Sequence, residues 1–287
     1  MAMYRAKSDG RGVCRFYEHE MGRRLDLRRG LETDLRNAII QGELQLNYQP
    51  VVDLKAKRVT GVEALMRWNH PTRGPVPPTE FIPIAEETGL IGQMGEWALR
   101  QACADAVSWS NGIRVAINLS PIQFRNMNLV SVVMSALGAS GLPADRLELE
   151  ITESVIMATN SQTVRMLTQL REIGVRISLD DFGTGYSGLG YFRQFQFDRV
   201  KIDQSFIREM LGKPESRAIV RAAIGLGRNM GISTTAEGVE TAEQLECLME
   251  EGCSQIQGYL FSKPLPSAEI ARMVETIRED FVTGECR

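Results

Sequence analysis

The chain has 287 residues, of which 43% are hydrophobic and 24% charged, and its 33 basic and 36 acidic residues give a formal net charge of −3. This composition excludes a disordered chain, and the charge balance argues against a general nucleic-acid-binding protein, so neither DNA nor RNA is an expected partner. The sequence has no Cys-x-x-Cys motif and only two histidines, so a Cys- or His-based metal site is not expected. Any metal would have oxygen ligands, which Mg²⁺, Mn²⁺ and Ca²⁺ prefer.

The sequence has no apolar stretch long enough to span a bilayer, and its N-terminus lacks the apolar segment of a signal peptide. We therefore expect a cytoplasmic protein that makes no membrane contact through this part of the chain. Whether a longer parent protein is anchored in a membrane stays an open question.

Strand and helix signals alternate along the chain. The first two strands, at 44–49 and 59–65, are separated by a short turn and predict a hairpin, so that one strand runs antiparallel to the rest. The later signals are a helical segment at 79–109, a strand at 115–119, a helix at 129–137, a strand at 147–151, a helix at 164–173, strands at 175–179 and 199–203, a helix at 217–230, a strand at 232–237, a helix capped by Thr241 and Gln244 and ended by Gly252, a strand at 254–257, and a final helix capped by Ser267. Seven or eight β/α units in about 250 residues predict an α/β fold, a modified TIM (β/α)8 barrel with one antiparallel strand.

Two adjacent carboxylates, Asp180 and Asp181, follow the strand at 175–179 and precede a glycine-containing loop. The C-terminal ends of strands are where α/β proteins bind ligands and metals. Neighbouring carboxylates repel each other unless a cation or a shared proton lies between them. The alternative is a solvated Asp-Asp turn, because Asp is a common turn residue.

Other polar residues recur near the C-terminal ends of the predicted strands, which share one mouth in a closed barrel. They are Glu63, Asn118, Glu150, Lys201, Glu237 and Gln257. Taken alone, each residue could have an ordinary structural or surface role. Their coincidence at the same end of successive strands favours a functional site. Several carboxylates at one mouth require cations, and two divalent ions suit an in-line phosphoryl displacement. Lys201 would lower the cost of the acidic cluster, and Arg67 is either a phosphate clamp or half of a surface ion pair.

These motifs resemble those of the EAL domain, the cyclic di-GMP phosphodiesterase family. The resemblance covers roughly residues 25–280, and the motifs are jointly specific, whereas Glu-Ala-Leu alone would not be. They are Tyr48-Gln49-Pro50, Glu63-Ala64-Leu65 with Arg67-Trp68, Asn118-Leu119-Ser120, Glu150-Ile151-Thr152-Glu153, Asp180-Asp181-Phe182-Gly183-Thr184-Gly185, Lys201-Ile202-Asp203, Ala236-Glu237-Gly238-Val239-Glu240 and Gln257-Gly258-Tyr259.

The resemblance implies hydrolysis of cyclic di-GMP to linear pGpG with two Mg²⁺ or Mn²⁺ ions, and Ca²⁺ as an inhibitory ion. The implied metal ligands are Glu63, Asn118, Glu150 and Asp180 for one ion, with Asp180, Asp181 and Glu237 for the second. The implied catalytic residues are Lys201, Glu237, Gln257 and Glu63, and the identity of the general base stays open. The implied substrate-binding residues are Arg67, Gln49 and Asp203.

The resemblance also implies a homodimer whose assembly is coupled to the metals through the loop Phe182-Gly183-Thr184-Gly185. Glu153 would anchor this loop, and Glu240 would support the mouth of the barrel. Such a loop would act as a switch as well as a ligand platform.

The first 24 residues do not fit the barrel pattern. Residues 1–18 resemble the end of a GGDEF domain without its catalytic signature, so we expect residues 1–24 to be a remnant or linker and residues 25–287 to form the EAL phosphodiesterase domain. Upstream GGDEF or sensory domains are then expected in the full-length protein. Two alternatives to a phosphodiesterase are a module that binds the cyclic dinucleotide without cutting it and a metal-dependent barrel enzyme of another class, such as an aldolase or isomerase.

Overall fold

The computed structural model describes residues 19–109, 112–125, 128–157, 161–185, 190, 192 and 195–283, in two compact units. The larger unit comprises Leu46–Met66 and Gly95–Arg287, and the smaller comprises Met1–Gln45 and Arg67–Met94. The expected remnant at residues 1–18 lies outside the described residues. The predicted division after residue 24 falls within helix α2 (His19–Gln41) and stays a prediction.

The larger unit contains a closed mixed barrel of eight strands, which confirms the predicted fold. The order around the barrel is β1, β9, β8, β7, β6, β5, β4 and β2, and pairing of β2 with β1 closes it. Strand β1 is antiparallel to β9, whereas the neighbours from β9 round to β2 are parallel. The strands are β1 (Leu44–Asp53), β2 (Arg58–His70), β4 (Arg114–Leu119), β5 (Leu147–Thr152), β6 (Arg176–Phe182), β7 (Arg199–Ile202), β8 (Ser233–Ala236) and β9 (Gln255–Ile256).

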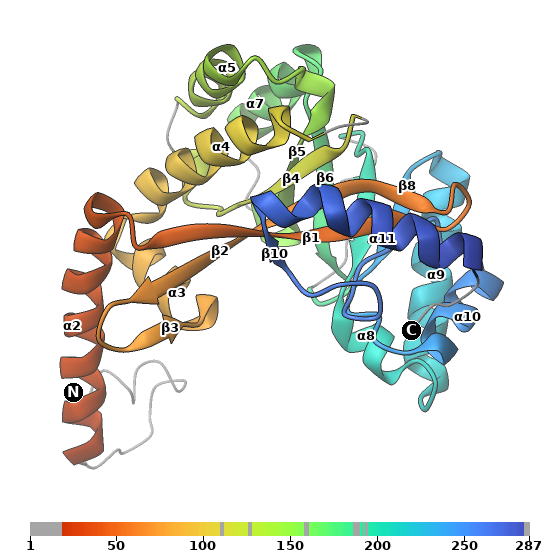
Figure 1. Cartoon of the computed structure of the whole chain (residues 1–287), viewed down its shortest axis with the longest axis horizontal. Coiled ribbons are helices and arrows are strands. Elements are labelled where there is room, and N and C mark those ends of the chain that lie inside the picture. Colours follow the sequence, from red (N-terminus) through yellow and green to blue (C-terminus); the bar gives the residue numbers. More distant parts are fainter. Residues whose placement is uncertain are drawn as a thin grey trace. The chain divides into compact units, whose positions relative to one another are not determined.

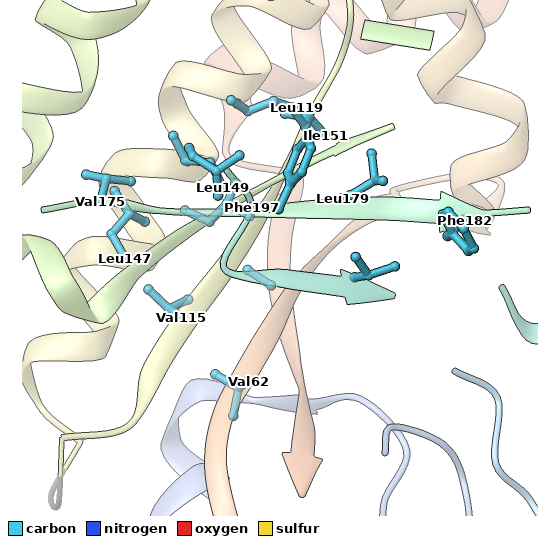
Figure 2. Close-up of a cluster of buried hydrophobic side chains, with 14 of the residues drawn as sticks. Val62, Val115, Leu119, Leu147, Leu149, Ile151, Val175, Leu179, Phe182 and Phe197 are labelled. Carbon is cyan, nitrogen blue, oxygen red and sulfur yellow. The ribbon is translucent and has the colours of Figure 1, made fainter. Parts of the chain in front are cut away.

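Alternation along the strands separates an apolar outer layer from a polar interior. On β5, Leu147, Leu149 and Ile151 belong to the hydrophobic core, whereas Glu148 and Glu150 are buried on the opposite face. Figure 2 shows this core, in which aliphatic side chains of neighbouring strands gather with Phe182 and Phe197. The charged residues between them therefore point into the barrel, where they meet residues from other strands.

The helices of the larger unit lie on the outside of the barrel strands (Figure 1). Glycines in the left-handed conformation end several of them, including α9 at Gly231 and α10 at Gly252. The predicted capping box of Thr241 and Gln244 at the start of α10 is confirmed. The α-helices that lie wholly or mostly in the larger unit are α4 (Ile91–Val107), α5 (Leu129–Ser140), α6 (Glu153–Met157), α7 (Ser161–Glu172), α8 (Gln204–Glu209), α9 (Pro214–Met230), α10 (Ala242–Glu251) and α11 (Ile270–Thr283).

The structure corrects two predicted helices. The segment at 79–109 is two helices, because Gly89 has a φ of 76° and ends α3 (Pro78–Thr88) before α4 begins. Ser267 does not cap the final helix: it is the first residue of the 3-10 turn η4 (Ser267–Glu269), and its hydroxyl accepts a hydrogen bond from the Trp109 indole. Sequence patterns also missed α2 entirely.

Short elements complete the fold. In the smaller unit, β3 (Gly74–Val76) pairs with β2, and the buried Trp68 packs edge-on against Phe81 while its indole nitrogen donates to Glu43. In the larger unit, β10 (Leu265–Pro266) pairs with β1. The 3-10 turns η1 (Gln123–Arg125) and η2 (Ala144–Arg146) lie before α5 and β5.

Candidate metal centre and active site

A pocket of about 450 Å³ lies at the C-terminal ends of the barrel strands. Seven of the sequence-predicted residues line it: Gln49, Glu63, Asp180, Lys201, Glu237, Glu240 and Gln257. Leu65, Gly238, Gly258 and Tyr259 from the quoted motifs also line it, and sequence analysis missed two further residues, Gln204 and Arg208. These two lie four residues apart on α8, which follows β7, and this spacing on a helix that follows a barrel strand was the available signal.

Lys201 is the centre of the charged cluster. Its side chain is 1% exposed, and its Nζ contacts carboxylates from four different strands or strand ends. The contacts are 2.6 Å to Glu237, 2.8 Å to Glu150, 3.2 Å to Asp180 and 3.4 Å to Glu63. The predicted meeting of strand-end carboxylates therefore takes place around one ammonium group.

Two amide side chains hold Glu63 from either side. Asn118 donates to Glu63 Oε1 at 2.6 Å, and Gln257 donates to Glu63 Oε2 at 2.6 Å. The Gln257 amide also donates to Gln49 Oε1 at 3.1 Å, and Gln49 in turn donates to the Ser262 carbonyl at 3.3 Å. This chain of hydrogen bonds joins β1, β2, β4 and the end of β9 at one point.

A break in the strand ladder presents the Asp180–Asp181 pair. The pairing of β6 with β7 shifts register between Leu179 and Phe182, and Asp181 has a φ of 55°, which is unusual for a residue other than glycine. The Asp181 N–H donates to Asp180 Oδ1 at 3.0 Å. One carboxylate oxygen from each of Asp180, Asp181 and Glu237 lies within 4.8 Å of the others, which is the grouping expected of a cation site.

Burial controls the protonation of this cluster. It raises the pKa of Glu237 to about 8 and the pKa of Asp181 to about 6, and in the latter the adjacent Asp180 adds to the effect. Burial likewise raises the pKa of Asp180, and that of Glu150 well above its ordinary value, despite the attraction of Lys201.

Glu63 and Lys201 are the two groups of the cluster whose pKa shifts favour the charged form. Burial opposes ionisation of Glu63, but Lys201 and the two amide donors outweigh it, so its pKa lies below the ordinary value. Burial also opposes the charge of Lys201, yet the surrounding carboxylates raise its pKa well above the ordinary value. The carboxylates therefore favour the charged form of Lys201.

The donor set fits divalent cations. Four carboxylates contact a single ammonium group and Asp181 lies beside two of them, so full ionisation would leave a strong negative excess that only further cations offset. Among the residues that the structure describes, the buried oxygens Glu150 Oε1 and Gln257 Oε1 lack a hydrogen-bond partner. Carboxylate and amide oxygens are the ligands that Mg²⁺ and Mn²⁺ prefer.

The loop after Asp181 is fastened to Glu153. The Gly183 N–H donates to Glu153 Oε1 at 3.1 Å, and Thr184 donates its hydroxyl hydrogen to the Asp181 carbonyl. A Cβ at Gly185 would lie 2.6 Å from Glu153 Oε2, so the glycine permits the close approach of that carboxylate.

Two predicted substrate-binding residues lie elsewhere. Asp203 is the N-cap of α8, where its Oδ1 accepts from the Ser205 N–H at 3.0 Å. Arg67 belongs to the smaller unit, so its expected contact with a phosphate stays a prediction. Within the part of the chain that the structure describes, we find no helix long and apolar enough to cross a membrane.

Comparison with known proteins shows the family to which this chain belongs. The EAL domain model matches residues 32–264. The chain is 48% identical over 279 residues to the uncharacterized protein y4lL of Sinorhizobium fredii, covering 97% of this chain and 34% of the relative. It is 39% identical over 284 residues to the cyclic di-GMP phosphodiesterase NbdA of Pseudomonas aeruginosa, covering 98% of this chain and 36% of the relative. The chain thus spans about a third of the length of these curated relatives.

Solved structures share the fold. A structure described as PaMucR phosphodiesterase in complex with c-di-GMP has 42% sequence identity and a TM-score of 0.81, covering 84% of this chain and 99% of that one. The EAL enzyme Bd1971, in a form bound to cAMP and cyclic di-GMP, has 35% identity and a TM-score of 0.83, covering 87% of this chain and 69% of that one.

Proposed function

Because this chain belongs to the EAL domain family, we propose that it hydrolyses cyclic di-GMP to linear pGpG in bacterial second-messenger signalling. The observation that carries the proposal is the group of buried carboxylates around Lys201 at the floor of a pocket. The names of NbdA and of the PaMucR structure support cyclic di-GMP as the substrate.

Two Mg²⁺ or Mn²⁺ ions would be held by the oxygen atoms of this cluster. Glu63, Asn118, Glu150 and Asp180 would hold one ion, and Asp180, Asp181 and Glu237 would hold the other. Such ions stabilise the charge that develops on phosphoryl oxygens and acidify water. We expect Ca²⁺ to inhibit, because it favours longer bonds and more ligands than the smaller ions.

The protein's own groups would orient the attacking water and the ester. Lys201 is buried among the carboxylates, so its ammonium group would donate a hydrogen bond to the attacking water. Gln257 is held by its bonds to Glu63 and Gln49, and its buried Oε1 would accept a hydrogen bond from the same water. Glu237 lies 2.6 Å from Lys201 and next to the two aspartates, where it would accept the proton once ionised.

The remaining predicted roles belong to the same proposal. Gln49, which lines the pocket, would contact the substrate. Arg67 and Asp203 are not among the residues that line the pocket, and their contact with the substrate is part of the proposal. The loop held by Glu153, together with Glu240 at the pocket, would couple a homodimer to the metal ligands. Upstream GGDEF or sensory domains would control that coupling in the full-length protein.

Turnover of cyclic di-GMP tests the proposal. We expect linear pGpG with Mg²⁺ or Mn²⁺, none with chelator, and none from Glu63→Ala. Glu250→Ala is the matched control, since Glu250 is an exposed carboxylate that pairs with Arg217. Tight binding of cyclic di-GMP without turnover would favour a binding module, and failure to bind it would favour a barrel enzyme of another class.

A further inference from the structure

The buried ion pair between Glu148 and Arg199 lies outside the pocket lining, and no step of the proposed reaction uses it. We infer that it is a positioning pair, which holds Lys201 against Glu150 and thereby sets the geometry of the metal site. The inference rests on the proposed phosphodiesterase function and assigns a role to two residues that are not themselves metal ligands.

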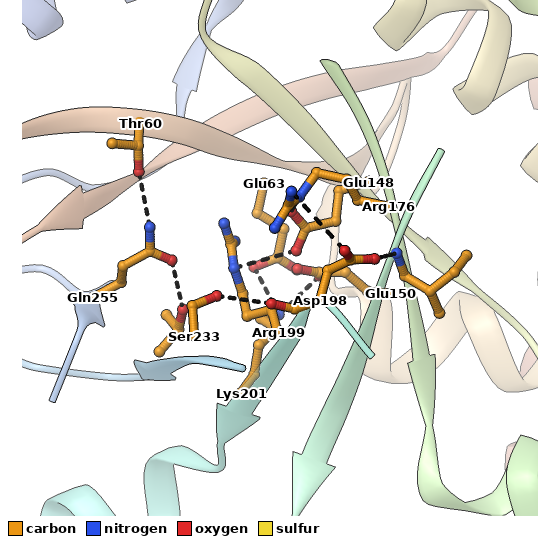
Figure 3. Close-up of polar contacts among 12 residues, drawn as sticks. Thr60, Glu63, Glu148, Glu150, Arg176, Asp198, Arg199, Lys201, Ser233 and Gln255 are labelled. Carbon is orange, nitrogen blue, oxygen red and sulfur yellow. Dashed lines mark hydrogen bonds and ion pairs between the residues drawn. The ribbon is translucent and has the colours of Figure 1, made fainter. Parts of the chain in front are cut away.

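Two acid–base pairs are stacked inside the barrel. Glu148 and Glu150 are two residues apart on β5, and Arg199 and Lys201 are two residues apart on β7. The Arg199 Nε lies 3.2 Å from Glu148 Oε1, and the Lys201 Nζ lies 2.8 Å from Glu150 Oε2. Figure 3 shows all four side chains, with the contacts of Glu148 and Arg199 separate from those of Glu150 and Lys201. Since β6 separates β5 from β7 in the sheet, both pairs join strands that are not neighbours.

The strand that carries Lys201 has two inward side chains, Lys201 and Arg199. β7 has four residues, of which Val200 and Ile202 belong to the outer hydrophobic core. Arg199 is therefore its second inward side chain. The ladder beside Lys201 is also irregular, because the β6–β7 pairing shifts register between Leu179 and Phe182. β8 pairs in regular register with all four residues of β7, so the ion pair of Arg199 adds an interior side-chain contact to a strand whose ladder is irregular only on the β6 side.

The Glu148–Arg199 pair is a buried ion pair whose facing atoms, Arg199 Nε and Glu148 Oε1, do not form a hydrogen bond. Glu148 is fully buried and Arg199 is 1% exposed, so neither charge can separate from its partner without losing compensation. Arg176 adds a second cation, with its Nε 3.7 Å from Glu148 Oε2. An apolar pair of similar volume in such a place often preserves stability. Stability alone therefore does not require these charges, and position is the property that they add.

A paired replacement separates position from stability. The enzyme would carry Arg199→Met, Arg199→Lys, or Glu148→Met together with Arg199→Met. We expect the single methionine variant to lose heat stability and turnover, because it leaves Glu148 buried without its closest partner. The double variant should melt within about 3 °C of wild type, yet its kcat should stay about tenfold or more below, with KM within about twofold. Arg199→Lys should recover part of kcat, since an ammonium can still pair with Glu148.

Two further measurements do not depend on turnover. Calorimetric titration with Mn²⁺ should show weaker binding to the double variant than to wild type. Its crystal structure should show Lys201 Nζ farther from Glu150 than the present 2.8 Å. A double variant with wild-type kcat, Mn²⁺ affinity and Lys201–Glu150 distance would overturn the inference. If the double variant does not fold, equal kcat in folded Arg199→Lys and Arg199→Met would overturn it.

Arg146→Met is the matched control. Arg146 precedes β5 and donates to the carbonyls of Ala106 and Ile113, outside the barrel interior. The Arg146→Met variant should have a lower melting temperature than wild type and an unchanged kcat. A wild-type protein without turnover would contradict the proposed function and leave the Lys201–Glu150 distance as the test of the positioning role.

Discussion

Replacing Lys201 by methionine tests whether one ammonium group holds the acidic cluster together. The substitution keeps the length of the side chain and removes a charge that contacts four carboxylates at 2.6 to 3.4 Å. In the absence of metal, these buried groups would then have to take up protons or repel one another.

The expected loss is large. Removing one partner of a buried ion pair costs about 3–5 kcal/mol. A chain of 287 residues has an unfolding entropy of about 0.6 kcal/mol/K, so the melting temperature should fall by about 5–8 °C at pH 7.5 in chelator. The deficit should be smaller at pH 5, where the carboxylates protonate more readily. Mn²⁺ should restore much of the stability, because bound ions replace the missing charge.

Catalysis should not recover with stability. With Mn²⁺ bound, the variant still lacks the hydrogen bond from Lys201 to the attacking water, so kcat should fall by about 10²–10⁴-fold. Thermal melts with chelator and with Mn²⁺, beside turnover of cyclic di-GMP, measure both effects. An unchanged melting temperature in chelator, or wild-type kcat with Mn²⁺, would refute the role given to Lys201.

Three further outcomes follow from the same geometry. The pKa of Glu237 is raised to about 8 and that of Asp181 to about 6, so the folded protein keeps protons that the unfolded chain loses. Without metal, the stability of the protein should therefore fall as pH rises from about 4.5 to 8. The increase in melting temperature caused by Mn²⁺ should be greater at pH 8 than at pH 6. Glu153→Gln replaces the charged acceptor of the Gly183 N–H by a neutral one, so turnover should fall severalfold and amide exchange in the loop should quicken, whereas unchanged exchange would count against the anchor. Gly258→Ala places a Cβ within 2.1–2.6 Å of neighbouring backbone atoms, so it should lower both the melting temperature and turnover, and an inert variant would show that the backbone yields there.

The barrel was predictable because its signals repeat. Each strand carries inward polar residues between apolar ones, as Glu148 and Glu150 do between Leu147, Leu149 and Ile151. Gly252 and the Thr241 capping box likewise mark helix ends by local chemistry alone. The break at Gly89 was missed because the apolar pattern continues on both sides of it.

The sequence predicted which residues lie at strand ends, but not their contacts. That Lys201 contacts four carboxylates depends on the closure of the barrel and on the register shift at Asp180, which is a tertiary property. Arg208 escaped prediction because an exposed arginine on a short helix looks the same in sequence whether or not it lines a pocket. Arg199 resembled an ordinary strand-start residue until the structure placed it beside Glu148.

Anomalous diffraction at the manganese edge, from crystals soaked in Mn²⁺, tests the central claim most directly. We predict two peaks about 3.5–4 Å apart, bridged by Asp180 and bounded by the carboxylates around Lys201. Soaked crystals with no peak there, or with manganese bound only elsewhere on the protein, would contradict it.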